Sequence, residues 1–405
     1  MLDDFGQRIR DIILSEMDLS RELSDEEICD LIGSVVSREA RDRPMTIKDR
    51  AELERTIFNS LRKLDVLQEL VDDRDVTEIM VNGPNDIFYE KAGRIQRFKG
   101  HFSSEEKLED VIQQIVGRHN RVVNQASPIV DTRLSDGSRV NIVLNPISIG
   151  GSAVSIRKFP EHPMSMERLV EIEALSPEVA RLLQILTQAK YNIFISGGTG
   201  SGKTTFLNAL SQYIPDEERI ITIEDSAELQ LLGAKNIVRL ETRNANTDGV
   251  TPITIRDLIR TALRMRPDRI IVGECRGAEA LDMLQAMNTG HDGSLSTGHA
   301  NSPHDIISRI ETMVLQGQDF PLNAIRQQIA SGIDIIVQLG RLRDKSRRVL
   351  EVSEVDGFMD GEIVLHTLYR FEETAVLDSG RIQGFLKKAG TLCHTDKLMA
   401  AGLSV

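Results

Sequence analysis

The residues with the clearest chemistry form one glycine-rich run. Gly197-Gly-Thr-Gly-Ser-Gly-Lys203-Thr204 matches the spacing GxxxxGK[ST] in full. It follows an apolar segment predicted as a strand (192–196) and precedes a predicted helix (203–213). Glycines let backbone N–H groups surround a phosphate, and a helix N-terminus favours negative charge. The run predicts a nucleotide-phosphate site made by Gly197, Gly198, Thr199, Gly200, Ser201, Gly202, Lys203, Thr204 and Thr205. We expect Lys203 to reach the β- and γ-phosphates and Thr204 to bind Mg²⁺.

Two predicted strands downstream of this run end in acidic residues. One ends at Glu224-Asp225 and the other at Glu274. In a parallel sheet ligands bind at the carboxyl ends of the strands, so both acids should face the phosphates. One carboxylate could hold Mg²⁺ and the other could orient water, while a helix cap or turn is the alternative role for either. Glu228 could share the site or lie on a solvated helix face.

Histidines and arginines supply further candidates. His291 and His299 lie in a glycine-punctuated segment (290–301), predicted as a polar strand that senses the γ-phosphate; a purely structural role is the alternative. Zinc is a poor interpretation because the segment lacks HExxH and a cysteine partner. Arg133, Arg139 and Arg157 fall on neighbouring predicted strands. They could bring positive charge to the γ-phosphate from another domain or subunit, although each taken singly resembles a surface ion pair.

The elements that must position these residues fall into three parts. Residues 1–70 read as amphipathic helices, with the second capped by Ser24 and the third running from Ile47 to about Leu70. They form either a small bundle or an interaction arm. Strands and turns at 71–158, with hairpins at 87–98 and 130–144 and a helix capped by Ser103, indicate a mixed α+β domain. A proline-containing linker follows at 159–166. From 167 to 405, strands and helices alternate as in a parallel sheet with crossover helices. After Gly340 little pattern is evident apart from a hairpin, and the basic run from Arg341 to Arg348, which includes Arg347, is predicted to be its solvated turn.

Composition narrows the function classes. The chain has 405 residues and a formal net charge of −13, with 4% aromatic residues and no Trp. An acidic balance disfavours a broad nucleic-acid surface, and scarce aromatics disfavour a base-stacking platform. Cys29, Cys275 and Cys393 form no CxxC pair, so a disulfide framework or structural zinc is not expected. No apolar run approaches the ~20 residues of a spanning helix, and no signal peptide is evident, so we expect a cytoplasmic protein.

Four segments occur in an order that is specific as a set. They are the glycine-rich run, the acidic box from Ile223-Glu-Asp225 to Glu228, the strand Ile270-Ile-Val-Gly-Glu-Cys-Arg276, and the histidine box from Gly290 to His299. Together they resemble the type II/type IV secretion ATPase superfamily over roughly residues 76–339. The CpaF type, the motor of tight-adherence (Flp/Tad) pili, is the most similar branch. Its support is Asn82-Gly-Pro84, Asp136-Gly-Ser-Arg139, Ser155-Ile-Arg157, the helical arm, and too few cysteines for the four-cysteine zinc module of related motors.

The resemblance implies an α/β fold in which a RecA-like P-loop ATPase domain follows a mixed α+β (PAS-like) domain and an N-terminal helical bundle. It also implies a homo-hexameric ring with ATP and Mg²⁺ between subunits. Glu274 matches the Walker B glutamate, a metal ligand with Thr204, and Glu224 matches the acidic-box glutamate. Arg139 and Arg157 match arginines that reach the nucleotide, and Arg133 is a weaker match. His291 and His299 match the histidine box.

The resulting hypothesis is a cytoplasmic ATPase motor, peripheral at the inner membrane through platform proteins, that drives assembly, retraction or both of a Flp/Tad pilus. The alternative within the superfamily is a type IV secretion ATPase for DNA or effector transfer. No direct nucleic-acid contact is expected because of the acidic charge. A third reading is a scaffold that binds ATP and hydrolyses little, against which the intact Glu224 and Glu274 argue.

Overall fold

The computed structural model describes residues 4–17, 21, 23–43, 45–91, 93–118, 122–159, 164–243 and 251–405. The chain divides into two compact units, residues 1–161 and 162–405. This division falls within the stretch 159–166 that the sequence predicts as a linker, of which residues 160–163 lie outside the described part.

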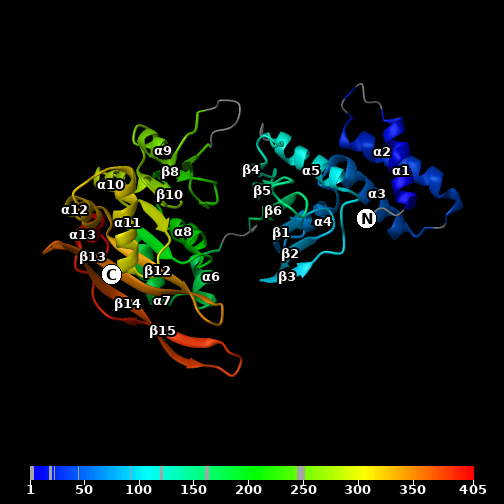
Figure 1. Cartoon of the computed structure of the whole chain (residues 1–405). Helices are drawn as coiled ribbons and strands as arrows, with labels where there is room; N and C mark the ends of the chain where they lie inside the picture. Colours follow the sequence, from blue (N-terminus) through cyan, green and yellow to red (C-terminus); the bar gives the residue numbers. More distant parts are fainter. Residues whose placement is uncertain are drawn as a thin grey trace. The chain divides into compact units, whose positions relative to one another are not determined.

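Three helices open the first unit and share one apolar core (Figure 1). They are α1 (Asp4–Glu16), α2 (Asp25–Glu39) and α3 (Ile47–Arg62). Ser24 caps α2 in a reciprocal box with Glu27, as the sequence predicts. The third predicted helix was expected to reach about Leu70, but α3 ends at Arg62. Asp65 adopts a left-handed conformation (φ 52°) that cannot continue a helix, and α4 (Gln68–Asp72) starts afresh.

A six-stranded antiparallel sheet forms the rest of the first unit, in the order β3-β2-β1-β6-β5-β4. Its strands are β1 (Val76–Asn82), β2 (Ile87–Lys91), β3 (Arg94–Arg97), β4 (Ile129–Arg133), β5 (Arg139–Val143) and β6 (Ala153–Arg157). Helix α5 (Glu105–Gly117) buries its apolar stripe against the sheet. Both predicted hairpins, β2–β3 and β4–β5, are present. The N-cap of α5 is Ser104 rather than the expected Ser103, because the Ser104 hydroxyl accepts the Lys107 N–H.

A nine-stranded sheet forms the centre of the second unit, in the order β15-β14-β13-β12-β7-β11-β10-β8-β9. Strands β7 to β12 run parallel to one another, which confirms the predicted parallel sheet. They are β7 (Ile193–Gly197), β8 (Arg219–Glu224), β9 (Asn236–Glu241), β10 (Arg269–Val272), β11 (Leu295–Gly298) and β12 (Ile335–Arg341). An antiparallel meander extends one side: β13 (Arg347–Met359), β14 (Glu362–Val376) and β15 (Ile382–Lys388).

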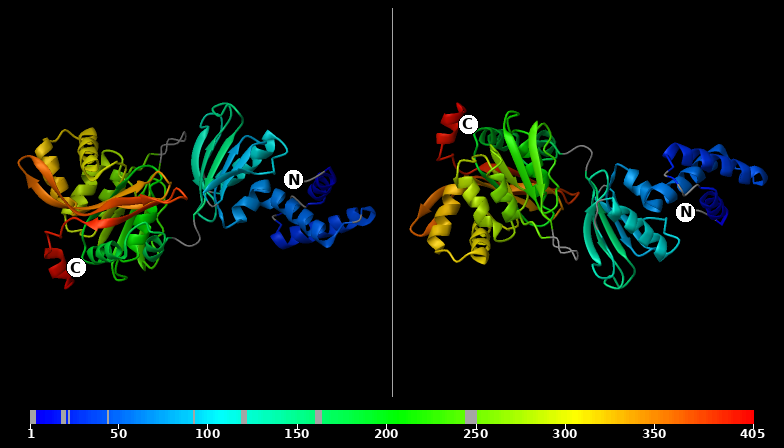
Figure 2. Two further views of the ribbon diagram at one scale, coloured as in Figure 1. Left: turned by 90° about the horizontal axis from the view of Figure 1, so that it is seen from below. Right: turned by 90° about the horizontal axis from the view of Figure 1, so that it is seen from above.

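Helices cover both faces of this sheet (Figure 2). One face carries α6 (Met166–Glu171), α7 (Pro177–Gln188), α8 (Lys203–Ser211) and α13 (Asp396–Ala401). The other carries α9 (Ile255–Ala262), α10 (Glu279–Asn288), α11 (Pro303–Gly317) and α12 (Leu322–Gly332). Along β7, Ile193 and Ile195 face the first group and Phe194 faces the second. Burial on both faces explains why these strands read as continuous apolar runs.

The sequence missed β9. After Gly340 it predicted one hairpin but neither the full meander nor α13, because that stretch shows no clear periodicity. Across the described ranges of the chain, no helix combines the length and the apolar character that crossing a membrane requires.

Candidate functional site

The glycine-rich loop connects the end of β7 to the start of α8. Gly200 (φ 71°) and Gly202 (φ 93°) have positive φ, which glycine adopts at little cost. The Lys203 ammonium is buried and donates to the carbonyls of Gly197 and Gly198, each at 3.0 Å. Burial lowers the pKa of Lys203, and the charge of nearby Glu274 opposes that shift. The ammonium therefore points into the loop, where phosphate oxygens could take the place of the carbonyls.

The loop fits a phosphate chain in two further respects. The Ser201 hydroxyl is buried and has no hydrogen-bond partner within the ranges that the structure covers. A Cβ built on Gly200 would meet no atom within 4 Å, so the loop leaves open space there. Thr204 and Glu274 offer the oxygen donors that Mg²⁺ prefers. When bound there, the ion would supply neutralising charge to the β- and γ-phosphates.

Glu274 lies just beyond the end of β10 and is held by two neighbours. Its Oε1 bonds to Nδ1 of His299, which follows β11, and its Oε2 accepts from Nη2 of Arg276 at 2.6 Å. Burial alone would raise the pKa of Glu274, but the hydrogen bond and charge of Arg276, together with His299, outweigh burial and lower it. The structure thus brings Glu274 and His299 together from adjacent parallel strands, with Glu274 ionised.

Glu224, at the end of β8, has different surroundings. Its side chain is buried, and its Oε2 accepts the backbone N–H groups of Glu228 (2.6 Å) and Leu229 (2.9 Å). A Cβ at Gly273 would lie 2.8 Å from Cγ of Glu224, so only glycine allows this close approach to the end of β10. Glu224 therefore organises the turn of the acidic box beside Glu274, and Glu228 joins it through its backbone.

His291 lies at the amino ends of the parallel strands, opposite the end that carries the P-loop. It precedes β11, which runs parallel to β7, and its Nδ1 is 3.3 Å from the Ala286 carbonyl. His299 and the P-loop follow the carboxyl ends of those two strands. The structure does not bring His291 to the P-loop of the same chain, and its predicted nucleotide contact would have to be made in a neighbouring subunit.

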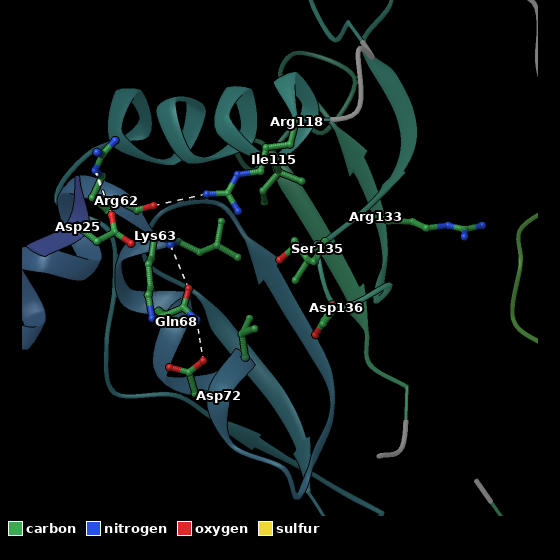
Figure 3. A pocket seen from close by; sticks show the side chains of 13 residues that line it. Asp25, Arg62, Lys63, Gln68, Asp72, Ile115, Arg118, Arg133, Ser135 and Asp136 are labelled. Atoms are coloured by element: carbon green, nitrogen blue, oxygen red, sulfur yellow. Dashed lines mark hydrogen bonds and ion pairs between the residues drawn. The ribbon is translucent and has the colours of Figure 1, made fainter. Parts of the chain in front are cut away.

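The three predicted arginines form one row in the first unit. The register pairs Arg133 with Arg139 and Arg139 with Arg157 across β4, β5 and β6. Directly opposed residues point to the same face, and that face is opposite to buried Val140. Figure 3 shows Arg133 pointing away from Arg118, Arg62 and Asp25, which lie near the helical arm. Asp131 is 3.8 Å from Arg139.

Adjacent like charges are destabilising in a sheet. An anion placed over this row of arginines would relieve that repulsion. Contact between this row and a nucleotide is a prediction.

Two features of the site escaped the sequence analysis. The sequence predicts no role for Arg276, although its place two positions after the predicted Walker B glutamate Glu274 is a signal that could have identified it. A cavity of about 60 Å³ borders Ser201, Gly202 and Thr205; apolar Met164, Leu169, Ile172 and Phe206 also line it, together with Arg347. Arg347 was predicted to lie in a solvated hairpin turn, and only the folded structure shows it beside the P-loop.

Residues 60–383 match the family described as type II/IV secretion system protein. The chain belongs to the type II/IV secretion system protein family. With the P-loop and Glu274 in place, it is an ATPase of that family.

Two curated relatives extend over most of the chain. Conjugal transfer protein TrbB of Rhizobium radiobacter is 31% identical over 332 residues, covering 81% of this chain and 98% of TrbB. Type IV secretion system protein PtlH of Bordetella pertussis is 33% identical over 320 residues, covering 73% of this chain and 94% of PtlH. Among solved structures, the pilus retraction motor PilT with bound ADP aligns with a TM-score of 0.53 at 22% identity, covering 76% of this chain and 82% of PilT. That last similarity supports the α/β fold.

Proposed function

We propose that this chain is the hexameric, cytoplasmic ATPase motor of a Flp/Tad-type pilus, acting on an inner-membrane platform complex. The observation that carries the motor assignment is the P-loop lysine after β7 near an ionised Glu274 after β10, two parallel strands that β11 separates. A RecA-like domain (167–405) would hold the nucleotide. A PAS-like domain (71–158) would present the arginine row to a neighbouring subunit, and an N-terminal helical bundle (1–70) would precede it.

The residues then divide the work as follows. The P-loop amides and Lys203 bind the phosphates, and Thr204 and Glu274 hold Mg²⁺. Glu274 also orients the attacking water, while His299 fixes its carboxylate. Arg139 and Arg157, with Arg133 beside them, bring positive charge to the γ-phosphate, where negative charge accumulates during transfer.

The pilus assignment rests on features outside the shared core. Helices α1 and α2, and α3 except for its last residues, precede residue 60, where the family match begins. Cys29 and Cys393 are exposed and Cys275 is buried, and three cysteines cannot supply a four-cysteine module. A type IV secretion role in DNA or effector transfer is the second candidate. The names of TrbB and PtlH, one in conjugal transfer and one in type IV secretion, favour it.

Replacing the Glu274 carboxylate by an amide tests the catalytic assignment. Glu274→Gln should lower kcat by about 10²-fold or more, because an amide neither carries the charge that holds Mg²⁺ nor accepts a proton from water. Binding of ATP should persist, since the P-loop is untouched. Steady-state turnover and nucleotide titration of purified protein measure the two effects.

Glu217→Gln, an exposed carboxylate of the same unit, is the matched control and should leave turnover unchanged. Hydrolysis by Glu274→Gln at the wild-type rate would refute the assignment. In the host cell, the Glu274→Gln variant distinguishes the two candidate functions. Loss of pilus filaments with unchanged DNA or effector transfer supports the pilus motor, and the reverse result supports the secretion ATPase.

A further inference from the structure

Gln338 of β12 is a buried polar residue beside the P-loop that the mechanism above does not use. It is 3% exposed, and the register places the next residue, Leu339, beside Gly197, where the P-loop begins. The Gln338 Nε2 donates to the carbonyls of Ala300 and Leu339, each at 3.2 Å. The Leu339 carbonyl packs against the P-loop, since it lies 2.8 Å from the position of a Cβ on Gly197. One amide group therefore joins the start of the P-loop to the residue that follows His299.

Packing alone does not explain an amide at this position. Ile336, two residues earlier on the same strand, faces the same side of the sheet and packs into the apolar core formed with α9 to α12. The Gln338 Oε1 is buried there, and it has no hydrogen-bond partner in the ranges that the structure describes. A buried polar atom without a partner is destabilising, and an apolar side chain would avoid that cost. The two bonds from Nε2 are therefore what the amide contributes.

We propose that Gln338 is a positioning residue that holds the backbone after His299 and, through it, the contact between His299 and Glu274. The inference rests on the proposed ATP site and adds to it a residue outside the four segments of the sequence resemblance. His299 Nδ1 bonds to Oε1 of Glu274, and Ala300 follows His299 directly. Because Gln338 holds the Ala300 carbonyl, the imidazole reaches Glu274 from a fixed backbone.

The backbone around Glu274 is held in a similar way by the neighbouring strand. The Thr297 hydroxyl donates to the Gly273 carbonyl, and the Thr297 carbonyl accepts the Cys275 N–H, each at 2.8 Å. These two bonds lie on either side of Glu274. Strand β11 ends at Gly298, so the segment of His299 lies beyond the strand and depends on contacts such as that of Gln338. Small displacements of catalytic groups cost much in rate, so holding both backbones should favour turnover.

The test compares ATP turnover by the full chain and by Gln338→Met, which keeps the side-chain length and removes the N–H groups. We expect kcat to fall about tenfold, the change that corresponds to one neutral hydrogen bond. Affinity for a fluorescent ATP analogue should change by less than about twofold, because the P-loop amides and Lys203 are untouched. Hydrogen exchange should rise at residues 299–301. An unchanged kcat overturns the proposal, as does an equal loss of analogue affinity, which would mean that Gln338 supports the P-loop instead.

A double-variant cycle with His299→Ala separates positioning from a merely structural role. If Gln338 acts through His299, Gln338→Met should cause no further loss of kcat in the His299→Ala chain. Losses that add, together with a lower melting temperature, would mean a general structural role and overturn the proposal. A wild-type kcat in His299→Ala would refute the role of His299 in the proposed function, and the positioning role of Gln338 with it. A reduced kcat there, with an unchanged kcat in Gln338→Met, overturns the positioning role alone.

Two further variants make the result specific. Thr187→Val is the matched control, because it removes another buried side-chain hydrogen bond of the same unit, from Thr187 Oγ1 to the Leu183 carbonyl at 2.8 Å. It should leave kcat unchanged. Gln338→Leu carries the same expectation as Gln338→Met and replaces it if circular dichroism shows that the methionine variant does not fold. Failure of the wild-type chain to bind the analogue at all would instead refute the ATP site.

Discussion

Glu224 and Glu274 occupy equivalent positions in the sequence pattern, but their surroundings in the structure differ. Both end a buried parallel strand, so either could orient water. Glu224 is buried, and one of its carboxylate oxygens accepts hydrogen bonds from two backbone N–H groups. These contacts suit Glu224 to holding the turn that follows β8. Glu274 is partly exposed, ionised and bonded to the side chains of His299 and Arg276, which suits it to chemistry. Gly273 is the contact point between them, because Glu224 packs where a Cβ would lie.

Gly273→Ala tests this contact. The added Cβ would lie 2.8 Å from Cγ of Glu224, closer than real Cβ contacts allow, so Glu224 or the end of β10 must shift. Because a displacement of about 1 Å can cost about 100-fold in rate, we expect kcat to fall by roughly 10- to 100-fold with a smaller change in KM. Gly117→Ala, where a Cβ meets no atom within 4 Å, is the control. Unaltered kcat in Gly273→Ala would show that the contact between Glu224 and β10 does not position Glu274.

At the scale of elements, ion pairs link helix α13 to the segments around the amino ends of β7 and β11. Lys397 pairs with Asp334 (2.7 Å) and with Asp292 of the histidine box (2.9 Å). Asp334 also accepts the N–H of Asn192, directly before β7, at 2.7 Å. These contacts lie at the amino ends of the strands, opposite the P-loop. Helix α13 therefore stabilises the end of the sheet opposite the P-loop.

The pH dependence of the stability of Lys397→Ala tests this contribution of α13. Burial raises the pKa of Asp334, although Lys397 opposes the shift, so the folded state favours the neutral acid. Stability from this group is greatest at low pH and falls as the pH rises through its folded pKa. Loss of Lys397 should therefore cost little near pH 4, and about 1–2 kcal/mol of unfolding free energy near pH 8, where the carboxylate is ionised.

Urea unfolding at both pH values, with hydrogen exchange of α13, measures this difference. Lys388→Ala, an exposed lysine of β15, should show no such pH dependence. An equal cost at both pH values would show that Lys397 acts through packing and not through Asp334.

The sequence predicted most of what a local pattern specifies. The P-loop, the strands on either side of it and the acids at their ends follow from spacing, because the motif and the parallel alternation agree. The position of His291 could not be predicted. Gly290 to His299 is one continuous segment in the sequence, but β11 lies within it, so His291 precedes the strand and His299 follows it. Arg347 reaches the P-loop only through pairing of β12 with both β7 and β13. Helix α13 has six residues and gives too little periodicity to detect.

At the scale of the whole molecule, the cations that we propose to act in ATP hydrolysis belong to two units. Lys203 lies in the second unit, and the row of Arg133, Arg139 and Arg157 lies in the first. The net charge of −13 is compatible with this arrangement because a few placed cations suffice. Our account requires that the arginines of one subunit complete the site of the next, as heterologous contacts in a closed ring allow.

Mixing two inactive variants tests that requirement most directly. Arg157→Ala keeps an intact P-loop and Glu274, whereas Glu274→Gln keeps an intact arginine row. In an equal mixture, about a quarter of the interfaces would join the two intact halves. We therefore predict that ATP turnover, near zero for each variant alone, rises after subunit exchange toward a quarter of the wild-type value. Turnover that stays at the level of the separate variants, with exchange verified, would contradict a site shared between subunits.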